Sequence, residues 1–151
     1  MTVAITKEPW PAIVDEIKPL LEAHRSALAV HKDSPLGPNY QTYDIAEQFG
    51  QLRCFVARDA GVVVGYAVFS VRAHLHYRTS VWAWNDVIWL SPESRKPRVG
   101  LRLIRFCEAS LTSEGVAVID WGVKTAHPAL GRVLSREGYE PVEVRYEKRV
   151  N

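Results

Sequence analysis

The feature that most constrains the fold is strand-forming sequence that fills residues 52–90. An apolar segment at 52–58 is followed by the turn sequence Asp-Ala-Gly at 59–61 and by a longer apolar segment at 62–71. Aspartate and glycine favour tight turns, and a continuous apolar run of this length is typical of a strand buried on both faces. The pattern predicts a β-hairpin whose second strand lies well inside a sheet.

A β-α-β unit is expected next in the chain. Tryptophan, valine and isoleucine are frequent over residues 80–90, which predicts a third strand, and Pro92 ends it because proline cannot donate to a sheet ladder. Apolar residues then recur at helical spacing over 99–111, before Gly115 ends the helix and a compact apolar strand follows at 116–119.

The N-terminal part predicts a short strand and two helices. Residues 3–5 favour a strand, and a helix begins at 9–11, where proline is tolerated in the first turn. Pro19 should kink or restart this helix because proline removes an internal hydrogen bond. A second, short amphipathic helix is expected from about 42 to 49.

The C-terminal part repeats the alternation of helix and strand. A helix at 128–137 is stopped by Gly138, and apolar residues that alternate with charged ones predict a half-exposed final strand at 141–150. The order of elements predicts an α/β fold (an α+β mixed sheet) with helices on its faces, in one domain spanning residues 1–151.

Composition excludes several classes of protein. The 151 residues are 47% hydrophobic and 24% charged, which suits one globular core. No segment approaches the ~20 apolar residues that span a bilayer, and the start lacks a signal-peptide pattern, so we expect a cytoplasmic protein. Cys54 and Cys107 lie in apolar stretches without metal-site spacing, which predicts buried thiols and no metal. The net charge of +2 suits an anionic cofactor but falls short of a nucleic-acid footprint.

The most informative motif lies at residues 86–104. A strand that ends before a proline leads into an arginine-containing loop and then into an amphipathic helix with a glycine near its start. Unpaired amides at a helix N-terminus, together with the helix dipole, form an anion site that suits a pyrophosphate. This stretch resembles the acetyl-coenzyme A (acetyl-CoA) binding segment of the GNAT N-acetyltransferases.

The resemblance implies a GNAT-type central mixed sheet and a set of coenzyme contacts. In that family the loop has arginine or glutamine, two residues, glycine, one residue, and glycine or alanine, and Arg95, Arg98 and Gly100 fall on those positions. The coenzyme contacts that it implies are Ile88, Leu90, Arg95, Arg98, Val99, Gly100 and Leu101.

Arg98 departs from the family, because it stands where the first glycine is usual. The backbone amides are still available there, and the guanidinium could itself pair with phosphate oxygens. An alternative stays open, in which Arg98, Arg102 and Arg105 form the solvated face of an amphipathic helix.

The resemblance extends to the end of the chain and covers about its last two-thirds. Residues 138–142, followed by 145–148, are similar to the closing helix, glycine-aromatic step and final strand of the family. The hairpin region at 75–78 is similar to acetyltransferase-like proteins that phages encode.

The resemblance assigns catalytic roles to two residues. Asp86 matches the position of a glutamate that acts as general base in many members, and it could act through water. The backbone N–H of Leu90 would stabilise the oxyanion of the thioester. A structural role for Asp86, as a strand aspartate that bonds the neighbouring loop, is the alternative.

The general acid is missing from its usual position. The family tyrosine of the last helix aligns with Leu134, which cannot donate a proton. Ser135 or Tyr139 could substitute, or the thiolate could leave without an acid, and we expect a slow or unconventional enzyme. His127 matches a position often held by asparagine, where it could orient cofactor or substrate, but a helix-capping role is favoured.

A candidate acceptor wall lies on the third predicted strand. Trp82, Trp84 and Asp86 share one face of this strand, and His76 and Tyr77 could edge the same site. Core packing is the alternative explanation for the tryptophans, and an exposed loop is the alternative for the histidine and tyrosine.

These observations predict an acetyl-CoA-dependent N-acetyltransferase that acts on a primary amine. The alternatives are a GNAT-fold binding module that keeps the acetyl-CoA site without turnover, which Arg98 and Leu134 favour, and an acyltransferase with another acyl donor. Acetyl-CoA and an amine acceptor are the expected partners, a membrane is not, and a second copy of the chain stays open; nucleic acid is disfavoured by the charge.

Overall fold

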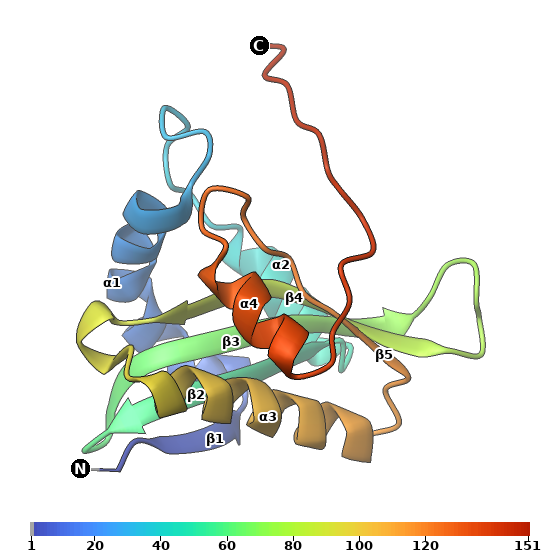
Figure 1. The fold of residues 1–151 in the computed structure, drawn as a ribbon, viewed down its shortest axis with the longest axis horizontal. Helices are drawn as coiled ribbons and strands as arrows, with labels where there is room; N and C mark the ends of the chain where they lie inside the picture. Colours follow the sequence, from blue (N-terminus) through green and yellow to red (C-terminus); the bar gives the residue numbers. More distant parts are fainter. Residues whose placement is uncertain (1) are drawn as a thin grey trace.

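Five strands form one mixed sheet in the order β1-β2-β3-β4-β5 (Figure 1). The structure, a computed structural model, describes residues 2–151. Strands β1 to β4 pair antiparallel with one another, whereas β5 pairs parallel with β4. In chain order the elements are β1 (Ala4–Glu8), α1 (Trp10–Leu28), α2 (Tyr40–Gln48), β2 (Leu52–Asp59), β3 (Val62–Ala73), β4 (Val81–Leu90), a 3-10 turn (Pro92–Ser94), α3 (Pro97–Ser113), β5 (Val118–Asp120) and α4 (Ala129–Arg136).

The predicted hairpin and the β-α-β unit are confirmed. β2 and β3 pair across the turn at Ala60 and Gly61, both of which have positive φ. β4 ends at Leu90, immediately before Ser91-Pro92, and the helix and strand that follow lie close to their expected places. The structure therefore confirms the predicted mixed sheet with helices on its faces.

One prediction of local structure is wrong, and of the two outcomes predicted for Pro19, a kink or a restart, the restart does not occur. No strand is present at residues 141–150; this segment is irregular and runs outward to the C-terminus (Figure 1). Alternating side chains describe one face of a strand but do not supply the neighbouring strand that its backbone needs. In addition, α1 does not restart at Pro19 but continues as one helix to Leu28.

The core consists of two layers, one on each face of the sheet. Trp10, Ile13 and Ile17 of α1 pack on one face, where Tyr66 and Val68 of β3 are buried. Figure 1 shows α3 and α4 over the opposite face. In that layer the buried residues are Phe55, Ala67, Phe69, Val71, Ala83, Leu103, Cys107 and Leu111.

The two cysteines belong to these layers. Both are buried, as the sequence predicts. Burial raises the pKa of the Cys54 thiol to about 12 and raises the pKa of Cys107 as well. Both side chains are therefore neutral packing groups. Within residues 2–151, no helix combines the length and the apolar character needed to cross a membrane.

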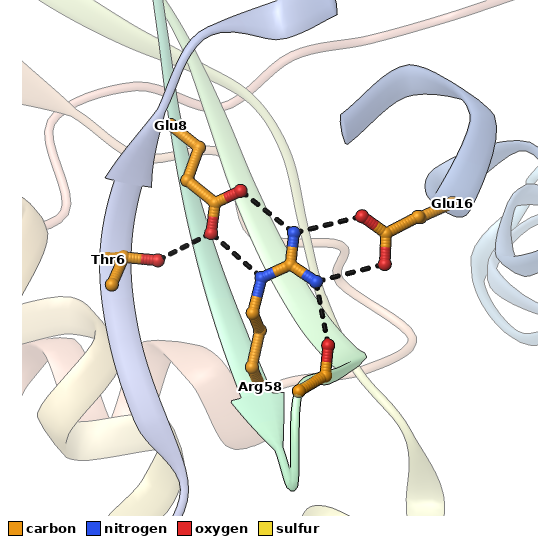
Figure 2. A network of polar contacts seen from close by, with 5 residues as sticks. Thr6, Glu8, Glu16 and Arg58 are labelled. Atoms are coloured by element: carbon orange, nitrogen blue, oxygen red, sulfur yellow. Dashed lines mark hydrogen bonds and ion pairs between the residues drawn. The ribbon is translucent and has the colours of Figure 1, made fainter. Parts of the chain in front are cut away.

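An arginine joins the first helix to the edge of the sheet. The Arg58 guanidinium donates to both carboxylate oxygens of Glu8 at 2.8 Å and to both of Glu16 at 2.9 Å (Figure 2). It also donates to the carbonyl of Gly61 at 2.8 Å. The hydrogen bonds from Arg58 lower the pKa of Glu8 and that of Glu16. This network holds β1, β2 and α1 in register with one another.

Gly65 of β3 provides a test of how closely the sheet packs at the end of β4. A Cβ at this position would lie 2.6 Å from Leu90 Cδ1 and 2.9 Å from the Trp89 carbonyl oxygen. Because the second of these atoms is backbone, Gly65→Ala should lower the free energy of unfolding by about 1–3 kcal/mol in urea denaturation.

Gly131→Ala is the matched control, because a Cβ there meets only the two methyl groups of Val123, at an ordinary 3.5 and 3.9 Å. Gly131 lies inside α4, so this change should raise stability by up to about 1 kcal/mol. Equal stability of the Gly65→Ala and wild-type proteins would contradict the close approach of β3 to β4.

Candidate active site

The pairing of β4 changes in the middle of the strand. Val68 of β3 pairs with Val87, but Phe69 pairs with Asn85, so Asp86 is an extra residue that forms a bulge. On the other edge, pairing with β5 covers only residues 82–84. Beyond Trp84, β4 therefore continues without a paired strand on its β5 side.

The end of β4 presents backbone groups along this open edge. The Ser91 N–H donates to the Val64 carbonyl of β3 at 2.7 Å. Because successive residues of an antiparallel strand direct their N–H groups to opposite edges, the N–H groups of Ile88 and Leu90 point away from β3. The Leu90 carbonyl, on the same open side, accepts a hydrogen bond from Arg95 Nε at 2.8 Å.

The N-terminus of α3 follows directly after this edge. Lys96 is its N-cap residue and makes no capping hydrogen bond through its side chain. Val99 is buried against Val3 and Ala57, which anchors the first turn of the helix to the sheet. A Cβ at Gly100 would meet no atom within 4 Å, so the space above this turn is open. The Val99 N–H already donates to the Lys96 carbonyl at 3.0 Å, so the N–H of Arg98 is the donor of this turn that remains for an anion.

The three arginines of α3 have different environments. Arg102 donates to the Val3 carbonyl at 2.9 Å, and Arg105 forms two hydrogen bonds to Glu137 at 2.7 and 3.0 Å. Arg98 is exposed, and in the described part of the chain no hydrogen bond or ion pair engages it. The stripe is therefore not one uniform solvated face, because two of its members hold the helix to its neighbours.

Asp86 meets a tyrosine that the sequence did not single out. The Tyr43 hydroxyl, from α2, donates to Asp86 Oδ2. Tyr43 also stacks on Trp10, with 4.8 Å between ring centroids. Burial raises the pKa of Tyr43, and the hydrogen bond to Asp86 raises it further, so the phenol keeps its proton. Asp86 itself is exposed, and the hydrogen bond from Tyr43 joins its carboxylate to α2.

A second, half-buried pair lies on the same face of the sheet. His24 Nδ1 and the Tyr66 hydroxyl are 2.8 Å apart and share a hydrogen bond. The His24 ring also stacks near Trp89, at 6.3 Å between centroids. Burial lowers the pKa of His24 to about 4, an effect that the charge of Asp86 partly opposes.

An aromatic ladder follows the first half of β4. Trp82 lies 5.8 Å from Trp84 and 4.3 Å from His74, and His74 lies 4.8 Å from Tyr77, as measured between ring centroids. The Arg72 guanidinium lies 4.3 Å from the centre of Trp84. Both tryptophans are half-buried and lie outside the core layers, so core packing does not explain them.

His76 joins this ladder at its outer end. Its N–H donates to His74 Nδ1 at 3.0 Å, and the two imidazole centroids are 5.6 Å apart. Tyr77 is 59% exposed. Only the two tryptophans of the ladder share β4 with Asp86, whereas His76 and Tyr77 are exposed residues of the loop that joins β3 to β4, which was their alternative explanation.

A model of a known protein family matches most of this chain. Residues 14–139 match the model of the acetyltransferase (GNAT) family. The chain belongs to the GNAT acetyltransferase family. Its members are N-acetyltransferases that use acetyl-CoA as co-substrate, so this protein is classed as an acyltransferase with that coenzyme. No curated protein sequence matches the chain.

Solved structures share this fold at low sequence identity. A ribosomal-protein-alanine N-acetyltransferase from Brucella melitensis biovar Abortus 2308 has a TM-score of 0.74 at 15% identity, with 99% of this chain and 100% of that chain covered. A transcriptional regulator from Bacillus halodurans C-125 has a TM-score of 0.78 at 13% identity, covering 98% and 99%. The aminoglycoside acetyltransferase AAC(6')-Iy, bound to a bisubstrate analogue, has a TM-score of 0.72 at 19% identity, covering 99% of each chain.

The α4 region of this GNAT protein contains no free tyrosine hydroxyl at the expected position. Leu134 is buried, and the Tyr139 hydroxyl donates to Glu108 of α3 at 2.8 Å. Burial raises the pKa of Tyr139 to about 12. The capping role predicted for His127 is wrong, because Pro128 occupies the N-cap of α4 and no side chain caps that helix.

The described residues also bear on metal binding. Within residues 2–151, no three histidine, cysteine, aspartate or glutamate side chains lie together in a group that could hold a metal ion.

The candidate site consists of the open edge of β4, the first turn of α3 and the Asp86 bulge.

The pKa of His24 predicts a pH dependence of stability. The folded protein holds this pKa near 4, below the ordinary 6.5, so the neutral ring contributes fully above pH 6.5 and its contribution is lost as the pH falls toward 4. At pH 5 the loss should be about 2 kcal/mol relative to pH 7. His24→Gln cannot titrate and should lack this component.

Urea denaturation of the wild-type and His24→Gln proteins at pH 7 and pH 5 measures the difference. The carboxylates with lowered pKa, such as Glu8 and Glu114, change the stability mainly at lower pH. They are present in both proteins, so their effect cancels in the comparison. If the two proteins lose the same stability between these pH values, His24 is not held neutral by burial.

Proposed function

We propose that this protein transfers the acetyl group of acetyl-CoA to a primary amine. The observation that carries the proposal is the open edge of β4, where the N–H groups of Ile88 and Leu90 face away from β3 beside the bulge at Asp86. Backbone donors in fixed positions suit the pantetheine amides and the oxyanion that forms at the thioester carbonyl. One domain spanning residues 1–151 would carry the whole reaction.

The coenzyme would bind with its pyrophosphate over the first turn of α3. The open space above Gly100, the N–H of Arg98 and the exposed Arg98 guanidinium support this placement. Arg95 would supply a second positive charge, next to the Leu90 carbonyl to which it already donates. Ile88, Leu90 and Val99 would contribute mainly through their backbone, because Val99 is buried against the sheet.

The chemistry would proceed by attack of the amine nitrogen on the thioester carbonyl carbon. The N–H of Leu90 would stabilise the resulting oxyanion, and collapse of the tetrahedral intermediate would break the C–S bond. Through water, Asp86 would accept the proton that the acceptor's ammonium group loses to become the attacking amine. Without an acid at Leu134, the thiolate would take its proton from solvent or leave as the anion.

The acceptor would contact the aromatic ladder on β4. Trp82 and Trp84, on the same strand as Asp86, would form one side of its site together with His76 and Tyr77 of the loop before that strand. The neighbours in fold are named for acceptors as different as a ribosomal protein and aminoglycosides, so the fold alone selects none. Action in the cytoplasm and likeness to phage-encoded proteins stay predictions.

A binding module without turnover is the second candidate function, and Leu134 is the observation that favours it. Thiol release from acetyl-CoA, measured across a library of primary amines, separates the candidates. Release that depends on one class of amine supports the enzyme, whereas coenzyme binding without release supports the module. Release only from longer acyl-CoA donors would point to another acyl group.

Gly100 tests the coenzyme site. Gly100→Asp should abolish measurable binding of coenzyme A in calorimetry, because it adds a carboxylate beside the phosphates. Gly100→Ala is the control: nothing lies within 4 Å of the new methyl group, so folding and binding should persist. If the aspartate variant binds as tightly as wild type, the pyrophosphate does not bind at this turn.

Asp86 tests the catalytic step. Asp86→Asn keeps the size of the side chain and can still accept from Tyr43, but it cannot act as a base. Turnover should fall on the order of 10²-fold or more, while coenzyme affinity and melting temperature stay near wild type. Tyr43→Phe removes the donor only, and it shows how much of any loss comes from altered positioning. A stable, fully active Asp86→Asn protein would rule out the catalytic role.

A further inference from the structure

The hairpin of β3 and β4 extends past the helices that cover the sheet (Figure 1). Val68 is the last residue of β3 in the buried layer under α1. Trp82 and Trp84 lie on this same face, because Ala83 between them is buried in the opposite layer. Both indoles are half-buried outside the two core layers, so the outer part of the hairpin presents rings that the core does not use.

The rings continue from β4 into the loop that joins the two strands. The Tyr77 and Trp82 rings are 6.3 Å apart between centroids and only 18° from parallel. His74 lies between them, at 4.8 and 4.3 Å. Tyr77 is largely exposed, which leaves ring surface for a planar partner. A series of aromatic side chains along one surface is typical of proteins that stack the bases of a single-stranded nucleic acid.

The hairpin also carries positive charge without carboxylates. Between Asp59 and Asp86 the sequence contains two arginines and no acidic residue. Arg72 and Arg78 are exposed, and within residues 2–151 no hydrogen bond or ion pair engages either guanidinium. Arg72 stacks on Trp84, which leaves its N–H groups free for phosphate oxygens. The net charge of +2 for the whole chain averages over this local distribution.

We propose that the β3–β4 hairpin binds a single-stranded nucleic acid, with bases on its rings and phosphates at its arginines. An acidic peptide would meet the arginines but would leave the ring faces unused, and a duplex keeps its base faces inside its own stack. Base rings and phosphates are common to RNA and DNA, so the hairpin recognises the single strand through features that both share.

The inner end of the hairpin has the opposite charge. Asp120 of β5 pairs in register with Trp84, and Asp86 follows two residues later on β4. A cationic group suits this end, whereas phosphates suit the outer end. The acceptor amine would therefore be carried by the bound strand and would reach Asp86 from the hairpin. This last step rests on the proposed function, whereas binding of the strand does not.

Fluorescence anisotropy with a labelled oligothymidylate of about 12 nucleotides tests the binding in the full-length protein. Tyr77→Ala should weaken binding about tenfold, because it removes one stacking surface, and should leave the salt dependence unchanged. Arg78→Gln should weaken binding and lower the slope of log affinity against log salt by about 0.7, the value for one phosphate contact on a single strand.

Tyr146→Ala and Arg136→Gln are the matched controls, because both side chains are exposed and belong to other parts of the chain. Both controls should bind the oligothymidylate like wild type. Inorganic polyphosphate has the charge without the rings, so it should displace the oligothymidylate only at about tenfold higher concentration or more. An equally long duplex should compete as poorly.

Three results would overturn the proposal. The first is that wild type does not bind the oligothymidylate. The second is that the hairpin variants bind it as tightly as the two controls, which places the nucleic acid elsewhere on the chain. The third is that polyphosphate competes as well as the oligothymidylate itself, which leaves the rings without a role. None of these measurements requires acetyl transfer, so a protein that binds the strand without releasing thiol from acetyl-CoA contradicts the proposed function alone.

Discussion

The structure depends on where strand β4 changes its partners. The ladder to β3 shifts by one residue at Asp86, and the ladder to β5 ends at Trp84, so both changes fall within three consecutive residues. A bulge bends a strand and increases its twist, and here it coincides with the separation of the two parallel strands. The backbone groups of residues 88–90 are consequently directed to an open edge instead of a neighbouring strand.

The bulge at Asp86 lies between groups on both faces of the sheet. On the side of α1 and α2, Tyr43 reaches Asp86, and His24 and Tyr66 form a half-buried neutral pair beside Trp89. On the chain that continues past Leu90, the first turn of α3 is anchored by a buried residue and leaves the N–H of Arg98 accessible. A donor coenzyme and an acceptor that approach β4 from different sides would therefore meet at the bulge.

The sequence predicts well the elements whose signals are local. Alternating and continuous apolar runs gave the hairpin, and Pro92 and Gly115 marked the ends of β4 and α3 close to where they lie. The final strand could not be predicted correctly because its backbone needs a partner, and alternation carries no information about whether one is present. The cap at His127 failed for a related reason, since Pro128 already holds the N-cap position.

The candidate site was predictable only in part. The strand, loop and helix of residues 86–104 are continuous in sequence, and so their order indicates an anion site. Tyr43 lies 43 positions before Asp86, and His24 lies 42 positions before Tyr66. No periodicity relates residues at such separations, so these contacts follow from the packing of α1 and α2 on the sheet. The sequence predicted that Trp82 and Trp84 share one face of a strand. That these side chains are half-buried outside the core layers follows only from the fold.

The central claim is that coenzyme A occupies the open edge of β4 and the first turn of α3 at the same time. Titration of the isotope-labelled protein with coenzyme A, followed by amide chemical shifts, tests it most directly. The shifts of Ile88, Leu90 and residues 98–101 should change together and saturate with one dissociation constant, while those of β1 and β2 stay constant. Shifts that saturate elsewhere, or that affect the helix turn without the strand edge, would contradict the account.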